Sequence, residues 1–294
     1  MEQEKYKKLF DDINNQQSNV VSQQRFIQIL NHLDIDFEID GDTINITDYN
    51  GDIDIPINKL TNNVIFNNIG YVHLKIKELP DNIIFKNGGN ITFINLVKFS
   101  SSNDKYIFYN KGSIYFNELI EFNRNIEFYN SGDVWFSKLL KLNEKIQFKN
   151  GRDLFFNSLI KIDFKNLKEN YIFNNKGSIY FHKLKIIRSE KYSIKFKNGK
   201  DINFNKIIKF SPFILLFENQ GDVQLNNLKH IHKYFFFNNK GVIYLKSFES
   251  LDREFIKTNK HKTIYISNYL YTSIFGVSVK LSLYWLNFFN IEFS

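Results

Sequence analysis

Two stretches of the sequence, FYNKGSIYFNEL from Phe108 to Leu119 and FYNSGDVWFSKL from Phe128 to Leu139, are near copies of each other, twenty residues apart. The Phe-x-Asn centre of this pattern occurs nine times, with 19 to 25 residues between successive copies. Its phenylalanines are Phe66, Phe85, Phe108, Phe128, Phe148, Phe173, Phe196, Phe217 and Phe237. A unit repeated at this period predicts a solenoid, in which each repeat forms one coil and packs on its neighbours.

The spacing of apolar residues inside a unit predicts its local structure. Apolar and polar positions alternate on both sides of the asparagine, as at Phe108, Ile114 and Phe116, which is typical of strands with one buried face. The apolar spacing then changes to three through Leu119 and Phe122, which indicates a tight turn. We therefore predict a mainly β chain that forms a single β-solenoid of about nine to eleven coils of 20–25 residues, with a short helical N-terminal cap.

Asparagine and glycine recur at fixed places in the unit. Asparagine follows the phenylalanine by two residues in all nine copies, and its parity points it into the core. A buried amide needs partners, so we expect a ladder of amides between coils, with a row of polar ligands as the alternative. Glycine comes two residues later in seven of the nine copies, where a corner needs positive φ or close approach of coils. Arg152 and Lys200 are the exceptions, and each follows a displaced glycine.

The L-x-x-[LFI] step, the period and the asparagine column, from Asn63 to Leu251, resemble bacterial leucine-rich-repeat proteins and related β-solenoids. The usual L-x-x-L-x-L-x-x-N order is not reproduced, and phenylalanine replaces many leucines. The F-x-N-x-G-x-[IV]-x-[FL]-x-x-L pattern is similar to repeats in proteins of bacteria and their phages. The resemblance implies binding and carries over no catalytic residue.

We expect three segments along the chain. Residues 1–62 form a cap of helices and a hairpin, residues 63–262 form the repeat solenoid, and residues 263–294 form a terminal coil and C-terminal cap. In the last segment the alternation from Phe275 to Leu283 favours a strand over a membrane helix. We therefore expect no membrane partner, and an uncovered C-terminal end leaves homo-oligomer formation open.

Composition excludes several kinds of chemistry. The chain has no cysteine, which excludes disulfides, thiolate catalysis and cysteine-ligated zinc. It has no phosphate-binding glycine loop, and His230 and His232 lack an evident third ligand, so we expect no cofactor and no metal. The first residues, MEQEKYKKLFDDINNQQ, have no apolar core of a secretory signal, so we expect a cytoplasmic protein. The net charge of +8 comes from scattered lysines and is compatible with an anionic partner.

One outward column, three residues after the glycine position, is rich in aromatic residues. It comprises His73, Thr92, Tyr115, Trp135, Phe155, Tyr180, Asn203, Gln224 and Tyr244. We predict a partner-binding surface formed by Tyr115, Trp135, Phe155, Tyr180 and Tyr244 with Lys111, Lys176 and Lys240. The alternatives are that the rings only stabilise the sheet, or that the N-terminal helices cover them.

These features favour a non-catalytic scaffold that binds a macromolecule, most simply a protein. Direct binding of single-stranded RNA or DNA is an alternative, because aromatic rings beside lysines can stack bases. A carbohydrate-active β-helix enzyme is another, because aspartates repeat at Asp133, Asp153, Asp201 and Asp222, although turn positions favour aspartate for structural reasons. A composition rich in Ile, Asn, Lys and Phe suggests AT-rich coding. Together with the phage-like repeat, it suggests an anti-CRISPR-like inhibitor of a host nucleic-acid-handling defence enzyme, whose partner would be that enzyme or a ribonucleoprotein.

Overall fold

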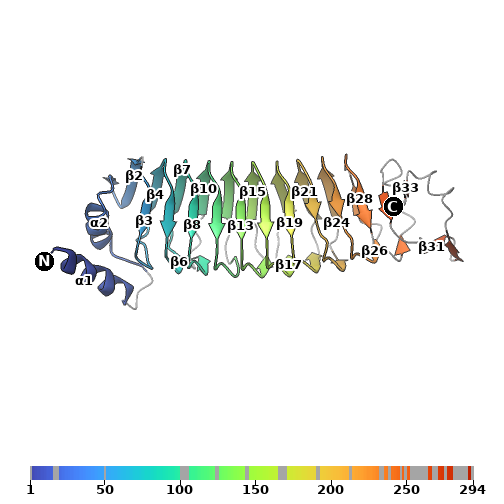
Figure 1. The fold of residues 1–294 in the computed structure, drawn as a ribbon, viewed down its shortest axis with the longest axis horizontal. Coiled ribbons are helices and arrows are strands. Elements are labelled where there is room, and N and C mark those ends of the chain that lie inside the picture. Colours follow the sequence, from blue (N-terminus) through green and yellow to red (C-terminus); the bar gives the residue numbers. More distant parts are fainter. Residues whose placement is uncertain are drawn as a thin grey trace. The chain divides into compact units, whose positions relative to one another are not determined.

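The protein folds as a β-solenoid of about eight turns, seen here in a computed structural model (Figure 1). The structure describes residues 2–15, 20–49, 51–99, 106–122, 126–142, 146–164, 171–189, 193–211, 214–231, 235–237, 240–245, 247, 250–251, 264–266, 271–274, 277–280 and 291–292. The coils group into two compact units. Unit 1 comprises Met1–Leu139 and Lys145–Gly151, and unit 2 comprises Leu140–Glu144 and Arg152–Ser294.

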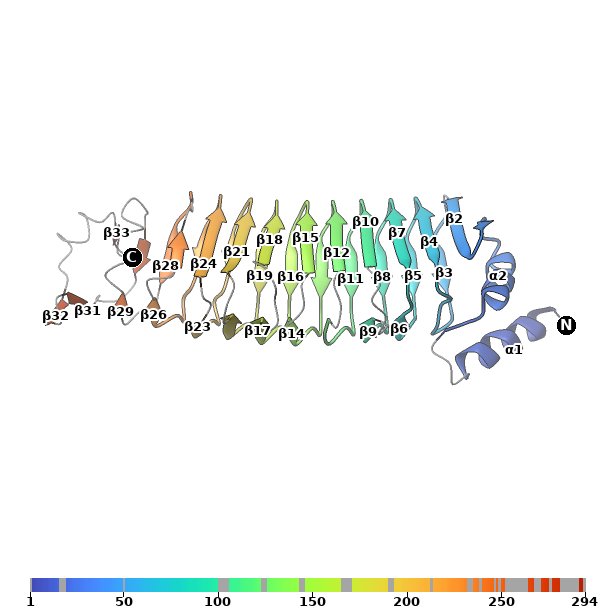
Figure 2. The same ribbon diagram turned by 180° about the vertical axis from the view of Figure 1, so that it is seen from behind.

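Unit 1 contains two parallel stacks of strands, one strand of each stack per coil (Figure 2). Sheet A is formed by β2 (Thr43–Tyr49), β4 (Val64–Asn68), β7 (Ile83–Asn87), β10 (Tyr106–Asn110), β12 (Ile126–Asn130) and β15 (Ile146–Asn150). Sheet B is formed by β3 (Ile53–Ile55), β5 (Val72–Leu74), β8 (Ile91–Phe93), β11 (Ile114–Phe116) and β13 (Val134–Phe136). A short third face contains β6 (Glu78–Leu79) and β9 (Lys98–Phe99).

Unit 2 repeats this arrangement. Its sheet A strands are β18 (Tyr171–Asn175), β21 (Ser193–Asn198), β24 (Ile214–Asn219) and β27 (Phe235–Phe237). Its sheet B strands are β16 (Leu154–Phe156), β19 (Ile179–Phe181), β22 (Ile202–Asn203), β25 (Val223–Gln224), β28 (Ile243–Leu245), β30 (Ile264–Ile266) and β33 (Ile291–Glu292). The third face contains β14 (Lys141–Leu142), β17 (Lys161–Phe164), β20 (Ile186–Ser189) and β23 (Lys209–Ser211). Two further pairs are β26 (His230–Ile231) with β29 (Ser250–Leu251) and the antiparallel β31 (Tyr271–Ile274) with β32 (Val277–Lys280).

Phenylalanine ladders fill the interior, as the alternation predicted. Phe108 pairs in register with Phe128, and their stacked rings are 4.9 Å apart. Within the same coil Phe108 meets Phe116 edge to face at 6.0 Å, so the rings of sheets A and B interlock. All three side chains are fully buried. Because the strands are parallel and in register, one side chain type can fill the same place in every coil.

The N-terminal end of unit 1 is closed by helices and a hairpin. α1 (Glu2–Asn14) is followed by α2 (Gln23–His32), which begins at the N-cap Ser22 and buries Phe26, Ile29 and Leu30. β1 (Glu38–Asp40) then pairs antiparallel with β2 through a turn in which Gly41 has φ of +58°. β2 itself pairs parallel with β4, so the hairpin passes directly into the first coil. None of the helices described is long and apolar enough to cross a membrane.

The predicted number of nine to eleven coils was too high. The ninth asparagine of the column, Asn239, and most of residues 252–294 lie outside the described residues. The predicted alternation from Phe275 to Leu283 is described only within β32, where the backbone is extended. The coils from β2 and β3 to β27 and β28 have strands on two long faces, whereas a leucine-rich repeat has one strand plus a helix or 3₁₀ turn.

Candidate interaction surfaces

The corner between sheets A and B is held by the buried asparagines. Asn130 donates through Nδ2 to the Gly132 carbonyl at 2.6 Å and to Asn150 Oδ1 of the next coil at 3.1 Å. Similar amide-to-amide bonds join Asn175 to Asn198 and Asn198 to Asn219, each at 3.0 Å. The predicted structural ladder is therefore present between these coils. Its donors point to protein acceptors, which accounts for the column without a ligand.

The aspartate column has a related structural role at the outside of the same corner. Asp153 Oδ1 accepts the backbone N–H of Ser178 at 2.7 Å, and Asp201 Oδ1 accepts that of Asp222 at 2.8 Å. Asp222 Oδ1 in turn accepts the N–H of Val242 at 2.8 Å. Each carboxylate thus bonds one coil to the following one. This role accounts for the repeated aspartates without assigning them to catalysis.

The predicted aromatic column lies on the outward side of sheet B, and its described rings are half-buried. In unit 1, Tyr115 pairs in register with Thr92 and Trp135, and the Tyr115 and Trp135 rings stack at 6.4 Å with 19° between their planes. In unit 2, Phe155 and Tyr180 stack at 4.9 Å with 9° between their planes. The rings therefore lie face to face along each unit, with their edges toward solvent.

Tyr244 extends the column of unit 2 beside the aspartate ladder. It pairs in register with Gln224, and its hydroxyl bonds with the side chain of Asp222. The negative charge of Asp222, followed by burial and this hydrogen bond, raises the pKa of the Tyr244 phenol. The predicted lysines Lys111, Lys176 and Lys240 are exposed at the corner between sheets A and B.

Sequence reasoning missed a second aromatic surface, which lies on the outward side of sheet A in unit 1. Tyr109 is 45% exposed, and its ring stacks on that of Tyr129 at 4.9 Å. Lys149 Nζ is 4.7 Å from the centre of the Tyr129 ring, and Tyr129 donates its hydroxyl proton to Glu127 at 2.8 Å. We call Tyr109, Tyr129 and Lys149 the tyrosine stack. The signal was present in the sequence as the FYN tripeptides at residues 108–110 and 128–130.

A shallow groove of about 720 Å³ lies along the tyrosine stack. Lys86 and Lys111 line it together with Asn67 and the exposed Ile69. Lys111 was predicted to border the sheet B column, and the structure places its side chain at this groove as well. The groove thus combines aromatic rings, an aliphatic side chain and positive charge.

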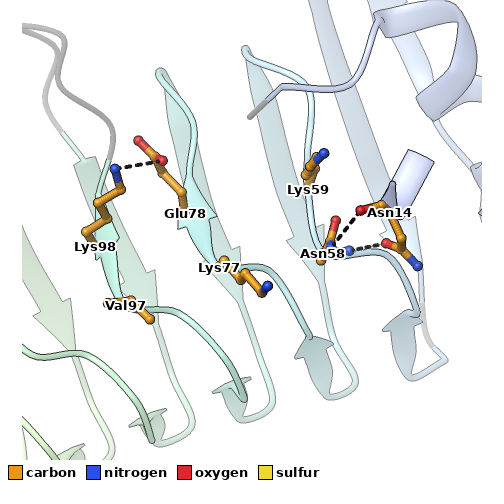
Figure 3. A pocket seen from close by; sticks show the side chains of 7 residues that line it. All are labelled: Asn14, Asn58, Lys59, Lys77, Glu78, Val97 and Lys98. Atoms are coloured by element: carbon orange, nitrogen blue, oxygen red, sulfur yellow. Dashed lines mark hydrogen bonds and ion pairs between the residues drawn. The ribbon is translucent and has the colours of Figure 1, made fainter. Parts of the chain in front are cut away.

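A second hollow, of about 400 Å³, lies next to the end of α1 on the edge between sheet B and the third face (Figure 3). Asn14 and Asn58 form two bonds there: Asn58 N–H donates to Asn14 Oδ1 at 2.9 Å, and Asn58 Nδ2 donates to the Asn14 carbonyl at 3.3 Å. Lys59 and Lys77 also line the hollow. Burial and the charge of Lys77 lower the pKa of Lys59. The two bonds between Asn14 and Asn58 fix the end of α1 against the first coil.

Among the residues that the structure describes, no three His, Cys, Asp or Glu side chains group as metal ligands. His232 lies outside that set, so the pair with His230 is not described. No known protein family, curated protein or solved structure matches this chain at a significant level.

Proposed function

We propose that this protein is a non-catalytic scaffold that binds a macromolecular partner, most simply a protein, through its outward aromatic residues. The observation that carries the proposal is the stacking of outward rings on successive coils: Tyr115 with Trp135 and Phe155 with Tyr180 on sheet B, and Tyr109 with Tyr129 on sheet A. A sheet can be stabilised by such pairs alone. Tyrosine and tryptophan rings at an outer surface are also the usual anchors of a protein interface.

The arrangement of the rings favours a protein over single-stranded nucleic acid. Stacked bases need an open ring face. The two rings of each pair cover one face of each other, and Lys149 lies over Tyr129. The ring edges and hydroxyl groups that remain suit the mixed apolar and polar contacts of a protein interface. The aspartates at the corner next to the sheet B column would also repel a phosphate backbone.

Replacement of Tyr115, Trp135 and Tyr180 by serine tests the proposal. The tagged protein would be used to capture partners from the lysate of a low-GC bacterium, and the captured proteins would be quantified by mass spectrometry. We expect a defined partner to be lost from the triple variant, with the circular dichroism spectrum retained. The matched control replaces Ile39, Val97 and Ile120, which are exposed apolar residues outside the ring columns, by serine. Equal capture by the wild type and the triple variant would contradict the proposal.

We further propose a narrower identity, a β-solenoid repeat protein of a bacterium or phage that inhibits a host nucleic-acid-handling defence enzyme. It is supported by the similarity of the repeat and by the composition. In the same capture experiment, an intact ribonucleoprotein would support inhibition of such an enzyme. RNA without protein would instead favour direct nucleic-acid binding. Turnover of a polysaccharide, abolished by Asp153→Asn, would favour the carbohydrate-active alternative.

A further inference from the structure

An exposed row of aliphatic and basic residues runs along one edge of unit 2, where sheet B turns into the third face. Its aliphatic members are Leu140, Ile160 and Ile208, and its basic members are Lys141, Lys185 and Lys209. We call these six residues the basic–aliphatic edge. The strands β14, β17 and β23, which follow this turn, lie along the lower side of the ribbon in Figure 2.

Backbone bonds show that the residues of the edge lie on successive coils. The N–H of Ile160 donates to the Leu140 carbonyl at 3.2 Å, that of Lys185 to the Ile160 carbonyl at 2.9 Å, and that of Ile208 to the Lys185 carbonyl at 3.0 Å. In the adjacent column Lys141 pairs in register with Lys161, and Ile186 pairs with Lys209. Each of these four coils therefore presents one aliphatic and one basic side chain, repeated at roughly 4.8 Å.

The aliphatic side chains of the edge are exposed, and they do not contribute to the hydrophobic core. Leu140 is 39% exposed, Ile160 44% and Ile208 52%. Their neighbours Leu139, Leu159 and Ile207 are fully buried and already supply the core contact of each turn. The exposed aliphatic residues thus lie on three of four successive coils, with Lys185 at the same place in the fourth, and the fold itself does not use them. Exposed apolar residues grouped in this way mark interaction surfaces.

The charge of the edge is positive and largely uncompensated. Lys141, Lys185 and Lys209 are exposed and have no ion pair with the described residues, whereas Lys161 pairs with Asp163 at 2.5 Å. The same edge in unit 1 is different. There Lys98 pairs with Glu78 at 3.2 Å, and Glu121 occupies a position of the same kind. Unit 1 also has Lys59 and Lys77 at this edge, but Glu78 and Glu121 lie among its lysines, so the edge of unit 2 has the higher net positive charge.

We propose that the basic–aliphatic edge binds the surface of a lipid bilayer that contains anionic lipids. Lysines attract anionic headgroups, and aliphatic side chains between them can enter the boundary of the acyl region. The edge is a convex corner between two faces, so it fits a broad and deformable surface better than it encloses a peptide. Binding of this kind lies on the membrane surface and needs no spanning helix. It departs from the expectation, drawn from the sequence, that the protein has no membrane partner.

Charge alone would also attract nucleic acid. The aliphatic residues distinguish a lipid bilayer from nucleic acid as the partner. Phosphate groups gain nothing from Leu140, Ile160 or Ile208, because an isolated phosphate backbone offers these side chains no apolar contact. A bilayer rewards both kinds of side chain. The proposal therefore predicts that aliphatic and basic substitutions weaken the same interaction.

The test is co-sedimentation of the full chain with vesicles of equal parts phosphatidylglycerol and phosphatidylcholine, at low ionic strength. We expect binding to these vesicles and not to vesicles of phosphatidylcholine alone. The variant Lys185→Gln with Lys209→Gln should lower the partition coefficient roughly 30-fold, since each lysine near an anionic surface contributes about fivefold. The variant Ile160→Ser with Ile208→Ser should lower it several-fold.

The matched control is Lys197→Gln with Lys200→Gln, which removes the same charge from exposed positions on another side of unit 2. We expect this control to bind within about threefold of the wild type, apart from the general effect of net charge. The proposal is wrong if the wild type fails to bind the anionic vesicles, or if the control loses as much affinity as the edge variant. It is also wrong if duplex DNA binds and the two serine substitutions leave vesicle binding unchanged.

Discussion

Asn198 shows how much of the fold depends on single side chains. Its Nδ2 donates to the Lys200 carbonyl at 2.7 Å, the Asp201 carbonyl at 3.1 Å and Asn219 Oδ1 at 3.0 Å. Its own Oδ1 accepts from Asn175. The residue is 3% exposed, so water cannot replace these partners. The same position in unit 1, Asn110, bonds mainly to the backbone of its own corner.

We predict that Asn198→Ala lowers the free energy of unfolding by about 2–3 kcal/mol, because it leaves buried carbonyls without a donor. Chemical denaturation measures the change. The control Asn174→Ala removes an exposed asparagine of β18 outside the ladder and should cost less. A loss below about 0.5 kcal/mol for Asn198→Ala would show that the ladder contributes little.

The pKa of the Tyr244 phenol depends on the charge of a neighbouring side chain. Its pKa lies above the ordinary value of 10.0, chiefly because of the Asp222 carboxylate. Asp222→Asn keeps an oxygen that can accept the Val242 N–H and removes the charge, so the pKa of Tyr244 should fall toward 10.0. The tyrosine ring signals, followed by NMR titration and assigned with Tyr244→Phe, measure the shift.

The sign of the linked stability effect follows from the raised pKa. Stabilisation of the protonated phenol is fully present below pH 10.0 and is lost as the pH rises through the higher folded pKa. The Asp222→Asn variant should lose this dependence. An unchanged pKa of Tyr244 in that variant would assign the shift to burial and to the charge of Asp201.

At the scale of the elements, the corner between sheets A and B depends on close approach of the coils. A Cβ added to Gly132 would lie 2.3 Å from the Gly112 carbonyl oxygen and 2.4 Å from its carbon. Of the glycines described, positive φ is found at Gly41. The repeated glycine is therefore required by contact between backbones, not by a left-handed turn. The sequence had left both reasons open.

We predict that Gly132→Ala lowers the free energy of unfolding by about 3 kcal/mol or more, because backbone atoms of the preceding coil must move. The neighbouring Ser131→Ala, at an exposed position, should change it by less than about 0.5 kcal/mol. Thermal and urea denaturation would compare the two variants. Equal stability of both would mean that the coils can separate at the corner without strain.

At the scale of the whole molecule, a solenoid gains its stability from coils and from the contacts between neighbours. The N-terminal end of unit 1 is closed by α2, whose Phe26, Ile29 and Leu30 are fully buried. Loss of this cap should expose the apolar interior of the first coil. The effect should decrease with distance along the stack.

We predict that Leu30→Ala lowers the stability of unit 1 by about 3 kcal/mol through the cavity that it leaves. Hydrogen exchange should show the greatest loss of protection in β2, β3 and β4, with unit 2 little changed. Ile39→Ala, at a residue 52% exposed, is the control. A uniform loss of protection over both units would indicate that the chain unfolds as one cooperative body.

The repeat alone predicts which residues of each coil lie inside and which lie outside. Period-two alternation places Phe108 and Ile114 inside and Tyr115 outside, and parallel stacking in register repeats each choice in every coil. For that reason the buried phenylalanines, the asparagine ladder and the aromatic pairs of sheet B were predictable from one repeat. The number of coils was predicted slightly too high.

Which outward residues of different faces lie close together follows from the tertiary structure and not from the repeat. Tyr109, Tyr129 and Lys149 occupy one column on sheet A, but their grouping with Lys111 across the corner depends on how sharply the chain turns there. The basic–aliphatic edge likewise depends on the corner between sheet B and the third face, where Ile160 and Ile208 are exposed. The alternation of apolar and polar residues predicts which face of a strand is buried. The angles between the three faces of a coil are set by packing instead. Those angles decide which surface residues from different faces lie close together.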